Sequence, residues 1–137
     1  MYLRVLFMLL ALVVQTAHAD IILILSDDKP SVTGVAKAIA AAYGEKIESY
    51  NMGGGLGKES EIVSAIQNSN TRQVVAVGLL AAQMARQRLP SKQVVFCQVL
   101  NFEEFDLVTP SMKGVSGIPS LSSQFAAWKL LDPGLRR

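Results

Sequence analysis

The chain has 137 residues, half of them hydrophobic, and a formal net charge of +2. This length suits one domain that is large enough to bury a sizeable core. The small charge excludes the basic field that attracts nucleic acid or an anionic membrane, so we expect neither as a partner.

The first 19 residues have the pattern of a secretory signal peptide. Arg4 is followed by an unbroken apolar run from Val5 to Val14, and then by the small-residue sequence Ala17-His18-Ala19. These features match the n-region, the h-region and the A-x-A cleavage site, and the apolar run is shorter than the about 20 residues that span a bilayer. We therefore expect cleavage after Ala19, a periplasmic location, and one mature domain over residues 20–137.

Removal of that segment would also remove the only histidine, His18, and leave Cys97 as the only cysteine. Without histidine the domain can form no Ser-His or Cys-His nucleophile pair and no histidine metal site, and one cysteine can close no internal disulfide. Cys97 lies in the apolar run "VVFC", which favours a core position over a reactive thiol. We therefore expect no catalytic residues, no metal site and no cofactor.

The rest of the chain alternates between strand patterns and helix patterns. Apolar, β-branched runs such as "IILILS" indicate strands that are buried on both faces, and apolar residues three and four positions apart indicate helices. Strands are expected at residues 21–26, 46–52, 73–78, 93–100 and, least distinctly, 113–120. Helices are expected at residues 30–43, around Ile62, Val63, Ala65 and Ile66, and at residues 79–89 and 120–131. In the last helix, Phe125, Trp128 and Leu131 form one stripe that we expect in the core.

Strands that alternate with helices of about ten residues imply right-handed crossovers and a parallel sheet that is covered on both faces. The expected fold is a three-layer α/β/α domain, a doubly wound parallel sheet of about five strands in the flavodoxin-like order 2-1-3-4-5. Ligands of such sheets gather at the loops that follow the carboxyl ends of the strands. The candidate loops are residues 26–31, 51–58, 78–81, 98–104 and 115–120.

Two stretches of the sequence are similar to motifs of phosphate chemistry, but each lacks residues that the motif requires. The stretch "NMGGGLGKESE" places Met52 where a P-loop needs its first glycine and Glu59 where it needs a hydroxyl, and no G-x-G-x-x-G register fits. Asp27-Asp28 suggest the acidic pair of a receiver domain, but Gly78 ends the third strand, where that fold needs its acceptor aspartate. The glycine stretch is therefore interpreted as a loop beside the ligand or the hinge.

Several short stretches follow the order of segments in one known family. "YNMGGG" resembles its asparagine-x-x-glycine turn after strand two, and "VVAVGLLAAQMA" resembles its strand three, glycine and alanine-rich helix. "KQVVFCQV" resembles its strand four, "KGVSGIPS" its threonine-glycine-valine-serine turn, and "LLDPGLRR" the leucine-x-proline segment before its second lobe. Together they resemble the first lobe of a periplasmic substrate-binding protein of ABC-type uptake systems, a family that includes tryptophan- and tyrosine-binding members.

The resemblance implies that two lobes close on a small, amino-acid-like solute and then dock on a membrane permease. Family members commonly have Thr or Ser followed by Pro after the strand-three glycine, whereas this chain has Leu79-Leu80. The residues expected to present hydroxyl, amide and backbone groups to the ligand are Ser26, Asn51, Gly53, Gly78, Leu79, Asn101, Ser116 and Gly117.

Two questions stay open at this point. The chain, which stops at Arg137, could be a fragment of a longer binder, one half of a split or homodimeric binder, or a stand-alone exported domain. The competing function is an exported, non-catalytic interaction or sensory module. In that case Phe102 and Phe105, which we expect to be tucked under the sheet edge, would instead meet a protein partner.

Overall fold

The structure is a computed structural model that describes residues 21–44, 46–117 and 121–131. The expected signal peptide and its cleavage site lie outside the described residues. No helix within the described ranges has the length and apolar character needed to cross a membrane.

The described part contains a five-stranded sheet in the order β2-β1-β3-β4-β5, and every neighbouring pair of strands is parallel. This confirms the expected doubly wound α/β fold. The strands are β1 (Ile21–Leu25), β2 (Ile47–Asn51), β3 (Gln73–Val77), β4 (Gln93–Cys97) and β5 (Met112–Gly114). The helices are α2 (Pro30–Tyr43), α3 (Glu59–Asn68), α4 (Leu79–Arg88) and α5 (Leu121–Leu131), with a short 3-10 helix, η1 (Phe102–Phe105), between β4 and β5.

Local chemistry explains where α2 begins and ends. Lys29 has an extended backbone, and Pro30, with its fixed φ and its missing N–H, occupies the first turn. The chain leaves the helix at Gly44, whose φ of 83° suits glycine. The predicted range of residues 30–43 is therefore confirmed.

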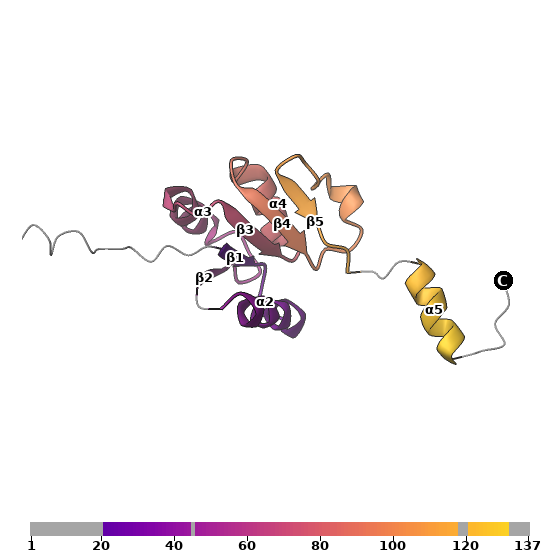
Figure 1. Cartoon of the computed structure of the whole chain (residues 1–137). Coiled ribbons are helices and arrows are strands. Elements are labelled where there is room, and N and C mark those ends of the chain that lie inside the picture. Colours follow the sequence, from indigo (N-terminus) through magenta and orange to yellow (C-terminus); the bar gives the residue numbers. More distant parts are fainter. Residues whose placement is uncertain (1–20, 45, 118–120, 132–137) are drawn as a thin grey trace, which may run out of the picture.

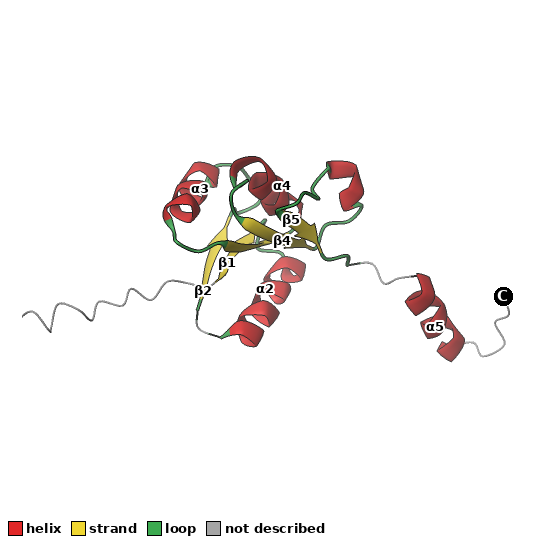
Figure 2. Cartoon of the chain, turned by 45° about the horizontal axis from the view of Figure 1, so that its top comes forward, coloured by secondary structure: helices red, strands yellow, loops and turns green. Residues whose placement is uncertain are grey.

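The helices cover the two faces of the sheet unequally (Figures 1 and 2). Figure 2 shows α3 and α4 on one face and α2 on the other. The α3/α4 face holds the larger core, in which Ile22, Ile66 and Phe96 are fully buried. The α2 face holds a smaller core around Leu23 and Val77. Alternate residues of the same strands thus enter very different environments.

The predicted bounds of the last two strands were wrong. β4 ends at Cys97, because Gln98 adopts φ 57° and turns the chain away. β5 lies earlier than expected, because Met112 is buried in the core and Gly114 lies against the Phe96 ring, where an added Cβ would overlap a ring carbon.

Contrary to expectation, the structure leaves the stripe of the last helix outside the core. Phe125, Trp128 and Leu131 are 48%, 52% and 85% exposed. Phe125 and Trp128 contact each other edge to face, with ring centroids 5.5 Å apart. Figures 1 and 2 both show α5 apart from the sheet.

Cys97 is half-buried rather than a full core residue. Desolvation by burial raises the pKa of its thiol, so the protonated and less nucleophilic form is favoured at neutral pH.

Candidate functional site

A hollow of about 450 Å³ lies at the carboxyl edge of the sheet. It is located between the loops that follow β1 and β3, where the strand order reverses and the helices change from one face to the other. Such a switch point is the place where open α/β sheets bind ligands. The hollow is lined by Ser26, Asp27, Lys29, Ser31, Val32, Gly54, Gly78, Leu79, Leu80, Gln83 and Gln98.

Ser26 and Gly78 form the base of this hollow by close contact. The N–H of Ala81 in the first turn of α4 donates to the buried Ser26 Oγ over 2.9 Å. Gly78 has φ 93°, and an added Cβ would lie 2.6 Å from the same Oγ, so only glycine fits. The Ser26 hydroxyl, which lies in the loop after β1, thus caps α4. In most helices this hydrogen bond is made by the residue directly before the helix.

The capped start of α4 presents backbone donors to the hollow. An α-helix leaves its first N–H groups without partners inside the helix, and these groups carry the positive end of its dipole. Ser26 satisfies the N–H of Ala81, whereas Leu79 and Leu80 precede that residue and line the hollow. Backbone N–H groups placed in this way bind anionic groups such as carboxylates.

Asn51 holds two loops together rather than lining the hollow. Its Oδ1 accepts the N–H of Gly53 over 2.7 Å, and its Nδ2 donates to Asp28 Oδ1 over 2.5 Å. The N–H of Gly54 also donates to the Ser26 carbonyl over 2.8 Å. Asn51 therefore links the loops that follow β1 and β2, and neither Asn51 nor Gly53 lines the hollow.

Asp27 and Lys29 form a charged pair at the rim. The N–H of Lys29 donates to Asp27 Oδ1 over 2.9 Å, and Lys29 Nζ lies 3.2 Å from Asp27 Oδ2. The backbone hydrogen bond from Lys29 is the main cause that holds the pKa of Asp27 below its ordinary value. Desolvation opposes this shift, and the side-chain hydrogen bond and the charge of Lys29 add to it. Asp27 is therefore ionised at neutral pH, and the exposed Lys29 ammonium can leave it at little cost.

The other expected ligand residues lie elsewhere. Asn101, Ser116 and Gly117 do not line the hollow, and all three are exposed. Asn101 has φ 49° and precedes η1. Of the eight expected residues, the structure thus brings Ser26, Gly78 and Leu79 together in the hollow.

The two phenylalanines of η1 have different environments. Phe102 is half-buried and packs edge to face on Phe96, with ring centroids 5.4 Å apart, as expected. Phe105 is 36% exposed, so the expectation that it is tucked under the sheet edge was wrong.

Sequence reasoning did not single out the two glutamines of the hollow, Gln83 and Gln98. Gln83 lies one helical turn after Leu79, which places the two residues on the same side of α4. Gln98 directly follows β4 and has a left-handed backbone, which directs the chain at the end of the strand. The spacing from Leu79 could have revealed the first glutamine, whereas the second depends on the turn that follows β4.

The hollow has several polar groups at its surface. It offers backbone N–H groups, two carboxamides, the Ser31 hydroxyl and one carboxylate with its ammonium partner. Within the described ranges, no group of three or more His, Cys, Asp or Glu side chains could hold a metal ion. Comparisons with models of known families, with curated proteins and with solved structures found no significant match for this chain.

Proposed function

We propose that this chain is a solute-binding lobe of an ABC-type uptake system, without catalytic activity, which takes a small amino-acid-like ligand at the carboxyl edge of its sheet. The observation that carries the proposal is the hollow at the switch point, where Leu79 and Leu80 at the start of α4 line the same space as the ionised Asp27. A zwitterion has the complementary charges, since its carboxylate suits the start of α4 and its ammonium suits Asp27.

Leu79-Leu80 change how the ligand carboxylate would be held. Family members commonly offer a hydroxyl and then a proline at these positions, and proline has no N–H. Leu79 lacks the hydroxyl of such a pair, and Leu80 supplies an N–H in place of the proline. The proposed contacts are therefore made by the backbone of α4, with Gln83 and Gln98 as side-chain donors or acceptors beside them.

One lobe forms only one wall of a binding cleft. Useful affinity for a small molecule needs most of its surface to be buried. We propose that a second lobe or a second copy supplies the other wall, and that the closed form docks on a membrane permease.

A thermal-shift screen of the free amino acids tests the proposal. A ligand at 100 times its Kd stabilises the folded state by about 2.7 kcal/mol, which corresponds to a rise in Tm of roughly 10 °C for a domain of this size. A flat response across the amino acids, together with stable association with a membrane or sensor protein, would favour an interaction module.

Two substitutions at Leu79 test whether the ligand binds to the backbone N–H groups at the start of α4. Leu79→Pro removes one N–H at the first helical position, where proline is tolerated, and the extended ψ of 165° at Gly78 is compatible with a following proline. Leu79→Ala removes the same side chain and keeps the N–H. We expect the proline variant to bind the ligand at least about ten-fold more weakly than the alanine variant, and equal affinities would contradict the proposed site.

One structural observation favours the alternative function, an interaction module. Leu100, Phe105 and Val108 are exposed apolar side chains in the segment between β4 and β5. These side chains would form the contact surface for a protein partner. Binding of a partner that is lost in Phe105→Ser and unchanged in Leu79→Pro would support the interaction module.

A further inference from the structure

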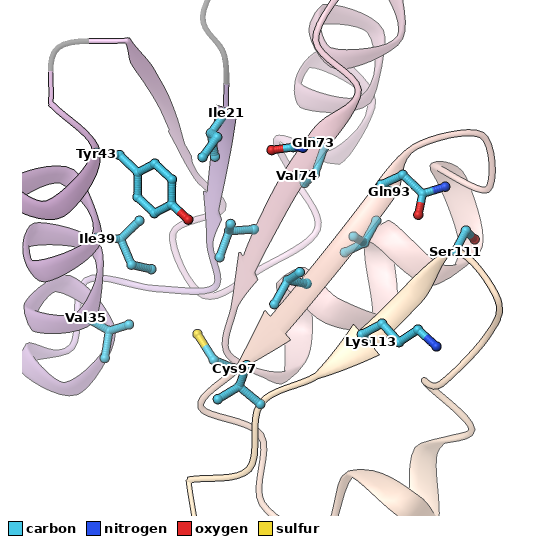
Figure 3. A pocket seen from close by; sticks show the side chains of 14 residues that line it. Ile21, Val35, Ile39, Tyr43, Gln73, Val74, Gln93, Cys97, Ser111 and Lys113 are labelled. Atoms are coloured by element: carbon cyan, nitrogen blue, oxygen red, sulfur yellow. The ribbon is translucent and has the colours of Figure 1, made fainter.

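The α2 face of the sheet carries an apolar groove of about 530 Å³ that no described element covers (Figure 3). Val35, Ile39 and Tyr43 of α2 form one side, and the exposed faces of β3, β4 and β5 form the base. Val95 is 42% exposed and Val115 is 56% exposed. Parallel sheets normally have both faces covered, so this half of the α2 face lacks the layer that such sheets have.

The helix α5 carries a surface that would fit this groove. Phe125, Trp128 and Leu131 recur at helical spacing and are all largely exposed. The aromatic pair within the stripe is already in edge-to-face contact. Exposed aromatic and apolar side chains in one stripe indicate a face that packs against another surface.

The dimensions of the two parts agree. A helix of 11 residues is about 16 Å long, and a strand of five residues is about 17 Å long. Residues 115–120 connect β5 to α5, and six residues reach up to roughly 20 Å when extended. The groove above β3 lies two strands from β5, or about 10 Å away, since neighbouring strands are about 4.8 Å apart.

The rest of the fold leaves α5 this one place on the sheet. The opposite face is occupied by α3 and α4, whose apolar side chains fill its core. On the groove face, α2 covers β1 and leaves the β4 side open. An apolar helix that follows the edge strand therefore meets an apolar surface of matching length only beside α2.

We infer that α5 docks into the groove of its own chain, with Phe125 and Trp128 against Val75, Val95 and Val115, and completes the second helical layer of the domain. The short connection gives α5 a local concentration near the groove of the order of millimolar, which favours its own chain over a second copy. This inference does not depend on the ligand or on the proposed function.

The single cysteine and the single tryptophan of the chain provide direct probes. Cys97 lines the groove and is half-buried without α5. We would measure the rate at which a disulfide reagent modifies Cys97 in the full chain, in Trp128→Asp and in Ala126→Asp. Ala126 lies on the opposite side of α5 from Trp128, so its variant is a matched control for the loss of helix propensity.

We expect Cys97 in the full chain and in Ala126→Asp to react at least about ten-fold more slowly than in Trp128→Asp, which corresponds to about 1.4 kcal/mol of docking free energy. The protection should not depend on protein concentration. Equal rates in the full chain and in Trp128→Asp would overturn the inference. Protection that grows with concentration would overturn it in favour of a second copy, and protection that persists in every variant would assign the groove to another segment or molecule.

A second measurement changes the groove rather than the helix. Val95→Lys places a charge at the base of the groove on an already exposed position, so the fold should tolerate it. If α5 docks, the emission of Trp128 should shift to longer wavelength in this variant. An unchanged emission spectrum would count against the docked helix even if Cys97 proved to be protected.

Discussion

Both faces of the sheet carry apolar side chains, but those on one face are buried and those on the other are partly exposed. In β4, Val94 and Phe96 point to the α3/α4 face and are buried, whereas Val95 between them is 42% exposed on the α2 face. Both sets are apolar, so the strand composition calls for a cover on both sides. The sequence of an apolar strand thus indicates that both of its faces need a cover, but it does not tell which segment of the chain provides that cover.

The largest loss of stability is expected from a substitution on the face of the sheet that α3 and α4 cover. Phe96→Ala removes a fully buried ring that contacts Phe102, and we expect a loss of about 3–5 kcal/mol in the free energy of unfolding. Val95→Ala should cost less than about 1 kcal/mol if the groove stays open. Urea unfolding of both variants measures the contrast, and a cost of more than about 1 kcal/mol for Val95→Ala would show that the groove is covered in solution, as the docking of α5 requires.

A smaller effect is expected at the base of the hollow. Gly78→Ala must place a Cβ near Ser26 Oγ at a positive φ, and we expect a loss of about 2–3 kcal/mol. Gly34→Ala in α2 is the control, because an added Cβ there meets no atom within 4 Å and should stabilise the protein by about 0.5–1 kcal/mol. Similar midpoints for both variants in urea would show that the contact with Ser26 is not tight.

The smallest effect should come from the rim. The pKa of Asp27 is lower in the folded state than its ordinary value of 3.8, so its contribution is present above that value and is lost as the pH falls through the depressed pKa. Asp27→Asn should therefore lower the stability slightly at neutral pH, and its stability should fall less steeply than that of the unmodified protein at acid pH. Unfolding curves below pH 4 measure the slope, with Glu103→Gln as an exposed control; a slope equal to that of the unmodified protein would exclude the contribution of Asp27.

Much of the fold could be predicted because its signals are local. The β1 run "IILIL" needs no tertiary information to indicate a buried strand, and Pro30 and Gly44 delimit α2 by backbone chemistry. The crossover rule then orders the strands and places Ser26 and Gly78 at one edge.

The remainder depends on contacts between distant residues. The position of β5 follows from the fit of Gly114 under the Phe96 ring, which no local pattern contains. Asn101, Ser116 and Gly117 follow strands as expected, but the paths of their loops keep them from lining the hollow. The stripe of α5 was expected in the core and is exposed in the structure, because its cover depends on a surface elsewhere in the chain.

Under the proposed function, the hydrogen bond from Ala81 to Ser26 would affect the rate at which a solute binds. It joins two segments that are 55 residues apart in the chain and holds the start of α4 against the end of β1 before any ligand arrives. A solute bound there would not have to order these two segments, so little conformational entropy would be lost on this side of the cleft. Slow steps in binding would then arise from the opposite wall, whose arrival, rather than the assembly of the hollow, would govern how fast the ligand is captured.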